Sequence, residues 1–132
     1  MNKWLSPFYI TIALTILFIA SSFTSFADKT NMIALYIVLS FITIFIHELG
    51  HVVFAVLAGY HFHFIIIGPI TIENNGKLKI MPNHSWAMFG GAAYCMPKNI
   101  DSELTKNHLW YTAGGPLFSL GTALIFLLIS LF

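Results

Sequence analysis

The sequence predicts a mainly α-helical membrane domain with about three transmembrane helices and a small β-hairpin between the second and the third. Three observations support this prediction. Hydrophobic residues make up 58% of the 132 residues and charged residues 8%, whereas soluble domains carry about 25% charged residues. Three apolar runs are each long enough to cross a bilayer, which takes about 20 residues. An Asn-Gly pair between two short runs rich in strand-forming residues indicates a hairpin.

The first expected span covers about residues 7–26, after a single lysine, Lys3. A secretory signal peptide is the alternative interpretation, because such peptides also begin with a positive charge and an apolar run. The apolar core of a signal peptide is usually about 7–15 residues long. The run here is longer, and its length favours an uncleaved transmembrane helix.

The second expected span covers about residues 32–60 and the third about residues 109–132. A polar turn at residues 28–31, with the sequence Asp-Lys-Thr-Asn, separates the first span from the second. We expect the three spans and the hairpin to form one domain over residues 1–132, either complete or as the front part of a longer core.

The hairpin is expected over about residues 62–81. Asn74-Asn75-Gly76 marks its turn, where a two-residue loop needs positive φ at both central positions. Gly68-Pro69 interrupts the first run and indicates an edge strand or a bend. Residues 85–97 contain Gly90-Gly91 and are expected to form a loop that dips into the protein or the membrane interface.

Lysine positions give the expected orientation, since cytoplasmic loops of membrane proteins carry an excess of positive residues. One side of a three-span arrangement holds five of the six lysines, and only Lys29 lies on the other. We therefore expect an integral protein of a bacterial-type cell membrane, with its N-terminus and hairpin in the cytoplasm. The net charge is +1 and the chain has neither an arginine nor a basic patch, so nothing in the sequence suggests a nucleic-acid partner. Cys95 is the single cysteine, so an internal disulfide is excluded.

Three ionisable residues lie within five positions of the second span, in the segment His47-Glu48-Leu49-Gly50-His51. Ionisable groups inside a membrane are costly and need an internal partner. Residues four apart on a helix lie on the same face, one turn apart. Both imidazoles can therefore reach one point, and zinc accepts histidine nitrogen. The pattern predicts a zinc site with His47 and His51 as ligands.

Glu48 lies about 100° around the helix from its histidine neighbour. From there it can reach water beside the metal and act as the catalytic base, which is the chemistry of the H-E-x-x-H motif. Two other interpretations are a hydrogen-bonded polar cluster without metal and a proton relay in a transporter. Neither of these needs the four-residue spacing.

With these residues the chain resembles the site-2 protease family of intramembrane zinc metalloproteases. The zinc motif lies inside a span, as it does in that family. Residues 64–69, Phe-Ile-Ile-Ile-Gly-Pro, resemble the Gly-Pro strand that follows the motif helix. Residues 113–119, Ala-Gly-Gly-Pro-Leu-Phe-Ser, resemble the Ala-Gly-Pro-Leu-x-Asn segment that opens the next core helix. The resemblance covers roughly residues 32–130.

The resemblance implies a zinc-dependent endopeptidase that cuts a transmembrane or membrane-associated peptide inside the bilayer. An edge strand of the hairpin would hold the unwound substrate by strand addition. Gly115, Pro116 and Ser119 would shape the substrate cleft. Ser119 stands where the family has Asn and offers a hydrogen bond of shorter reach.

The third zinc ligand of the family is an Asp in a later Leu-Asp-Gly motif, and no acidic residue follows Glu103. Three explanations stay open: the chain is the front part of a longer protease, a second chain supplies the Asp, or a local residue replaces it. His108 is the best local candidate, and the weaker ones are His61, His63, His84, Asp101 and Glu103. The alternative function is a non-catalytic membrane partner or regulatory subunit that retains a zinc motif.

Overall fold

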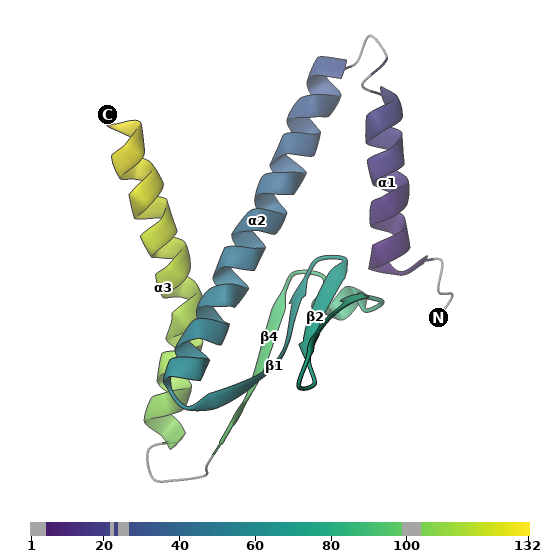
Figure 1. Ribbon diagram of the computed structural model, residues 1–132. Coiled ribbons are helices and arrows are strands. Elements are labelled where there is room, and N and C mark those ends of the chain that lie inside the picture. Colours follow the sequence, from purple (N-terminus) through teal and green to yellow (C-terminus); the bar gives the residue numbers. More distant parts are fainter. Residues whose placement is uncertain (1–4, 22, 24–26, 99–103) are drawn as a thin grey trace.

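A computed structural model describes residues 5–21, 23, 27–98 and 104–132 of the chain. It contains three α-helices and one four-stranded antiparallel sheet, which confirms the mainly helical fold with a small β insert (Figure 1). The elements are α1 (Pro7–Ser21), α2 (Ala27–Leu57), β1 (Tyr60–Ile67), β2 (Ile70–Asn74), β3 (Leu78–Pro82), the 3₁₀ turn η2 (Trp86–Met88), β4 (Ala92–Pro97) and α3 (Leu104–Ser130).

Two of the described helices are long and apolar enough to cross a membrane: α2 from Lys29 to Leu57, and α3 from Leu104 to Ser130. The described part of α1 has 15 residues, which is about 22 Å of helix, against a hydrocarbon thickness of about 30 Å. The predicted end of the first span at residue 26 lies outside the described residues. A third span therefore stays a prediction.

Helix α2 begins and ends earlier than predicted. The expected polar turn at residues 28–31 is helical, because none of its four residues is the proline or glycine that would interrupt a helix. At the other end, the helix stops at Leu57 rather than residue 60. Gly59 follows with φ +83°, the left-handed conformation that commonly terminates helices. Tyr60 then begins β1.

Helix α3 runs without interruption through Pro116 and starts five residues before the predicted span. Proline has no backbone N–H, so the Thr112 carbonyl lacks its usual helical donor. Figure 1 shows α2 and α3 meeting near the end of α2 and diverging toward the C-terminus of α3. The two helices therefore have a packed end and an open end.

The hairpin region folds as a three-stranded meander. The two-residue turn Gly68-Pro69 joins β1 to β2, with Ile67 paired to Ile70. Gly68 has φ +54°, as primed hairpin turns require at the first central position. The turn at Asn75-Gly76 joins β2 to β3 as predicted, but the loop has three residues between Asn74 and Leu78. Only Gly76 has positive φ among the described residues of that turn.

The prediction of a loop over residues 85–97 is wrong in its second half, where β4 pairs with β1 in the antiparallel direction. The strand order is β3-β2-β1-β4, so β3 and β4 are the edges of the sheet. Gly91, with φ +110°, turns the chain into β4. The apolar run of β4 shows no polar alternation, and this absence concealed the strand at the sequence level.

A small core joins the sheet to the end of α2. Its buried members are Ala55, Tyr60 and Cys95, with Val52 and Tyr111 packed against them. Burial raises the pKa of the Cys95 thiol to about 11, so the thiol stays protonated at neutral pH. This core fixes β4 beside the two long helices.

Candidate metal centre

The predicted zinc motif lies where α2 crosses α3, and two glycines make that crossing close. A Cβ atom at Gly50 would overlap the Gly114 carbonyl oxygen, and a Cβ at Gly114 would overlap the Gly50 carbonyl oxygen. The backbones are therefore in direct contact, which small residues permit between membrane helices. Every residue near this contact is held at a short distance from the partner helix.

His47 and His51 both face α3 at this crossing, as their four-residue spacing predicts. Their ring centroids are 4.9 Å apart. A Cβ atom at Gly115 would overlap His51 Nε2 and would lie 2.7 Å from His47 Nε2. The two Nε2 atoms therefore converge on one point beside the bare backbone of Gly115. Any larger residue there would fill the space between them.

The other nitrogen of each histidine ring has its own partner. His51 Nδ1 lies 2.8 Å from the Tyr111 carbonyl oxygen, which only accepts hydrogen bonds, so Nδ1 carries the proton. The Nε2 lone pair of His51 is then available to a metal. His47 Nδ1 lies 3.0 Å from Ser119 Oγ. Such bonds from the second nitrogen orient metal-binding histidines.

Glu48 is buried, with 8% of its surface exposed. Its side chain faces the sheet: a Cβ atom at Gly91 would lie 2.6 Å from Glu48 Oε1 and 2.8 Å from Ile44 Cγ2. Gly91 thus leaves space for the carboxylate in the turn before β4. The histidines face α3 and the carboxylate faces the sheet, as the rotation of about 100° between neighbouring helix residues requires.

The two imidazole nitrogens are donors that suit zinc. They supply two of the three protein ligands that a catalytic zinc site needs. Across the described ranges, no three His, Cys, Asp or Glu side chains gather at one point that could hold a metal ion. The exposed side chain of His108 is therefore not brought to the two histidines; its ring centroid lies 5.7 Å from that of Tyr111. Asp101 and Glu103 lie outside the described residues.

The predicted substrate residues lie on α3 beside the histidines. Gly115 is buried and Pro116 is exposed. Ser119 was expected to contact substrate, but its hydroxyl contacts His47 in this structure. The substrate-binding role of all three residues stays a prediction.

Tyr111 is a site residue that the sequence reasoning missed. Its carbonyl accepts the His51 hydrogen bond, and its phenol donates to the Ala93 carbonyl of β4. It thereby connects one histidine to the edge strand. No residue pattern signals a backbone carbonyl, so the sequence offered no way to find this role. Gly91 could have been suspected from Gly90-Gly91, but only its place beside Glu48 explains it.

The fold and the site together define a helical domain with two long apolar helices and the H-E-x-x-H residues of metallopeptidases at their crossing. The sequence model of Peptidase family M50 matches residues 34–132, three quarters of the chain. The chain therefore belongs to Peptidase family M50, the site-2 protease family of membrane zinc metalloproteases. Comparisons with curated proteins and with solved structures gave no significant match.

Proposed function

We propose that this chain is a zinc-dependent intramembrane endopeptidase, or the His-Glu-His portion of one, that cuts a transmembrane or membrane-associated peptide. The observation that carries the proposal is the convergence of His47 Nε2 and His51 Nε2 beside Gly115, with the buried Glu48 on the same helix. Membership of family M50 supports a protease of this kind.

His47 and His51 would hold the zinc ion through their Nε2 atoms. When bound, zinc supplies Lewis acidity that polarises a peptide carbonyl and acidifies water. Glu48 takes a proton from the water that attacks the carbonyl carbon, and returns it to the leaving amine as the C–N bond breaks. Glu48 is buried, and electrostatic interactions are stronger in such a water-poor environment.

We place the substrate along β4, as an added strand. An edge strand presents unpaired backbone groups that can bind an extended peptide. A cavity of about 420 Å³ lies between β4 and the start of α3, with Tyr94, Met96 and Tyr111 among its lining residues. β4 is the edge connected to His51 through Tyr111. The other edge, β3, is exposed and contains Lys79, a feature that discourages strand pairing.

We place the third zinc ligand outside the described residues, as an Asp on a further segment or on a second chain. We also propose that the N-terminus and the sheet lie in the cytoplasm, with three spans in all. Four lysines of the described residues lie on the sheet side of the long helices, against one on the other side, and this supports the orientation. They are Lys77, Lys79, Lys98 and Lys106, against Lys29.

The test is Glu48→Gln in the full chain, purified and reconstituted in lipid vesicles with zinc. The probe is a transmembrane peptide with Gly and Asn near its centre, labelled with a fluorophore and a quencher, because a substrate helix must unwind before its carbonyls are accessible. We expect cleavage to fall by at least about 100-fold, the effect of removing a general base, while bound zinc is unchanged by metal analysis.

Glu73→Gln is the matched control, because Glu73 is a glutamate of β2 whose carboxylate accepts a hydrogen bond from Asn75. It should cleave like the wild-type protein. Equal cleavage by the Glu48 and Glu73 variants would refute the protease proposal. Zinc binding without cleavage in every form would instead support the alternative, a non-catalytic partner or regulatory subunit.

A further inference from the structure

The outer edge of β4 carries backbone groups that have no strand partner in the described part of the chain, where β4 pairs with β1 only. Successive residues of an antiparallel strand direct their N–H and C=O groups to opposite edges. The Lys98 N–H donates to the Gly59 carbonyl on the β1 side. Alternation along β4 therefore turns the backbone groups of Ala93, Cys95 and Pro97 toward the outer edge.

Two details of the sheet agree with this alternation. The β-bulge between Phe62 and Phe64 adds its extra residue to β1, so the alternation along β4 is not interrupted. Pro97 has no N–H, and proline is tolerated where a strand turns that position to an open edge. The Ala93 carbonyl is therefore one of the acceptors that an added peptide strand would meet.

This acceptor is already occupied. The Tyr111 phenol donates a hydrogen bond to the Ala93 carbonyl. Tyr111 belongs to α3, so the bond runs from the helix to the outer edge of the sheet. It lies on the side of β4 where the proposed function places the substrate. A peptide strand and the Tyr111 side chain would therefore need the same carbonyl.

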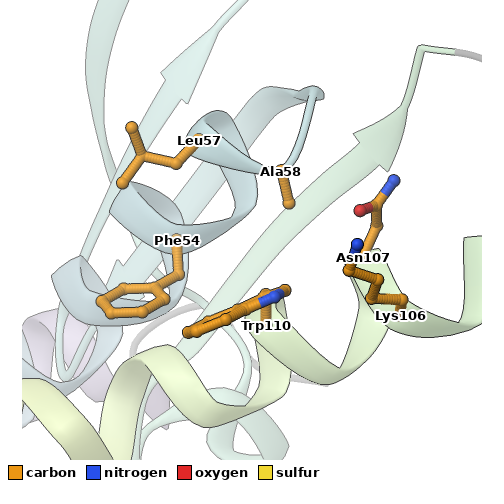
Figure 2. A pocket seen from close by; sticks show the side chains of 6 residues that line it. All are labelled: Phe54, Leu57, Ala58, Lys106, Asn107 and Trp110. Atoms are coloured by element: carbon orange, nitrogen blue, oxygen red, sulfur yellow. The ribbon is translucent and has the colours of Figure 1, made fainter. Parts of the chain in front are cut away.

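The backbone of α3 is held against α2 near Tyr111. Trp110 stacks on Phe54, with ring centroids 5.9 Å apart and planes inclined by 24°. Figure 2 shows these two side chains reaching toward each other from the two helices. One turn farther along α3, the backbones of Gly50 and Gly114 are in contact. Release of the β4 carbonyl therefore takes a rotation of the tyrosine side chain rather than a shift of the helix.

We propose that the Tyr111 side chain is a latch on β4: its phenol holds the Ala93 carbonyl in the free protein and is displaced when a peptide strand adds to this edge. A backbone N–H of the peptide then takes the place of the phenol donor. Only an unwound peptide can supply it, because a helical segment bonds its own N–H groups. The latch rests on the proposed function, since it needs a substrate strand on β4.

The His51 ring is connected to the latch residue only through its backbone. His51 Nδ1 contacts the Tyr111 carbonyl, which a rotation of the side chain leaves in place. Zinc binding and peptide binding can therefore be altered separately at this one residue. Tyr111→Phe is the informative variant, because it removes the phenol oxygen and keeps the ring with its neighbours His51 and Tyr60.

The test measures peptide binding by the full, zinc-loaded chain carrying Glu48→Gln, so that the peptide stays intact. The probe is the same transmembrane peptide with a dansyl group, and energy transfer from the tryptophans of the protein in lipid vesicles reports binding. We expect Tyr111→Phe to bind the peptide about fivefold more tightly. That factor corresponds to one hydrogen bond that the peptide no longer has to displace.

Tyr36→Phe is the matched control, because it removes a phenol from a side chain of α2 that is 63% exposed. It should bind the peptide like the parent protein. Equal binding by the Tyr111 and Tyr36 variants, or weaker binding by the Tyr111 variant, overturns the latch. Chelator competition should show that Tyr111→Phe keeps its zinc affinity. Loss of zinc would mean that the phenol itself positions His51, which also overturns the latch.

A peptide with N-methyl groups on its central backbone nitrogens separates the latch from the placement of the substrate. It has no N–H to offer the strand edge, so we expect it to bind weakly and equally to the parent protein and to Tyr111→Phe. If it binds as tightly as the unmodified peptide, strand addition on β4 is wrong and the latch is lost with it. If methylation weakens binding but Tyr111→Phe brings no gain, strand addition stands and the latch alone is overturned.

Discussion

The two long helices are packed at one end and open at the other, and the candidate metal site lies at the packed end. Around Gly50 and Gly114 the backbones of α2 and α3 touch, and the predicted zinc residues lie there. Toward the C-terminus of α3, each of the six residues from Leu124 to Ile129 is more than half exposed. Figure 1 shows that this part of α3 diverges from α2.

The packed end is specified by residues without side chains, and the open end by residues with large ones. Gly50, Gly114 and Gly115 each have no space for a Cβ atom, whereas Gly121, farther along α3, has no atom within 4 Å of the position its Cβ would occupy. Glycine costs about 1 kcal/mol relative to alanine in a helix interior. The three glycines of the crossing offset this cost because they permit close approach of the two helices. Gly121 offers a matched control for substitutions of these glycines.

The largest effect is expected for Gly115→Ala. Its methyl group would overlap His51 Nε2 and separate the two imidazoles. We expect zinc affinity to fall by about 100-fold, the upper range for changes that disturb ligand orientation. The measurement is competition for zinc between the purified protein and a chromophoric chelator.

Gly121→Ala is the control for this experiment, as a glycine-to-alanine change in the same helix with open space around it. It should bind zinc like the wild-type protein. Unchanged zinc affinity in the Gly115 variant would mean that the metal does not bind between these two nitrogens, and the proposed centre would be lost.

A second effect concerns the stability of the crossing itself. Gly50→Ala would place a methyl group against the Gly114 carbonyl and 2.6 Å from Phe118 Cβ. Such overpacking costs about 1–3 kcal/mol, so the thermal unfolding midpoint in detergent should fall. Gly121→Ala should keep or raise the midpoint, since alanine has the higher helix propensity. Equal midpoints for the two variants would contradict the distinction between packed and open ends.

Much of the fold could be predicted because apolar run length and turn chemistry are local properties. The long apolar segments predicted α2 and α3, and Asn75-Gly76 predicted the β2–β3 turn. The sequence could not reveal β4, because a strand without alternation is recognisable only through its partner, β1. Similarly, the start of α2 was obscured by four polar residues that a helix tolerates at its end.

In the candidate site, too, the local features could be predicted and the long-range contacts could not. The placement of His47 and His51 on one face follows from helix geometry alone, and the structure places them so. The contacts that orient them come from α3, 60 and 72 residues away in sequence, through Tyr111 and Ser119. These depend on the register of two helices, which is set by the glycine contact and is invisible in either helix alone.

The smallest of the three effects is expected at one of those orienting contacts. Ser119→Ala removes the hydroxyl that lies 3.0 Å from His47 Nδ1. Loss of such a partner weakens metal binding by about tenfold, so the chelator competition should show a shift smaller than that of Gly115→Ala. Ser119→Thr keeps a hydroxyl and should restore affinity, which a loss of packing alone would not predict. Ser130→Ala is the control, because the Ser130 hydroxyl donates a hydrogen bond to the Leu127 carbonyl of its own helix. If the Ser119 and Ser130 variants bind zinc equally well, Ser119 does not position His47, and its predicted contact with substrate becomes the better account of its place in the site.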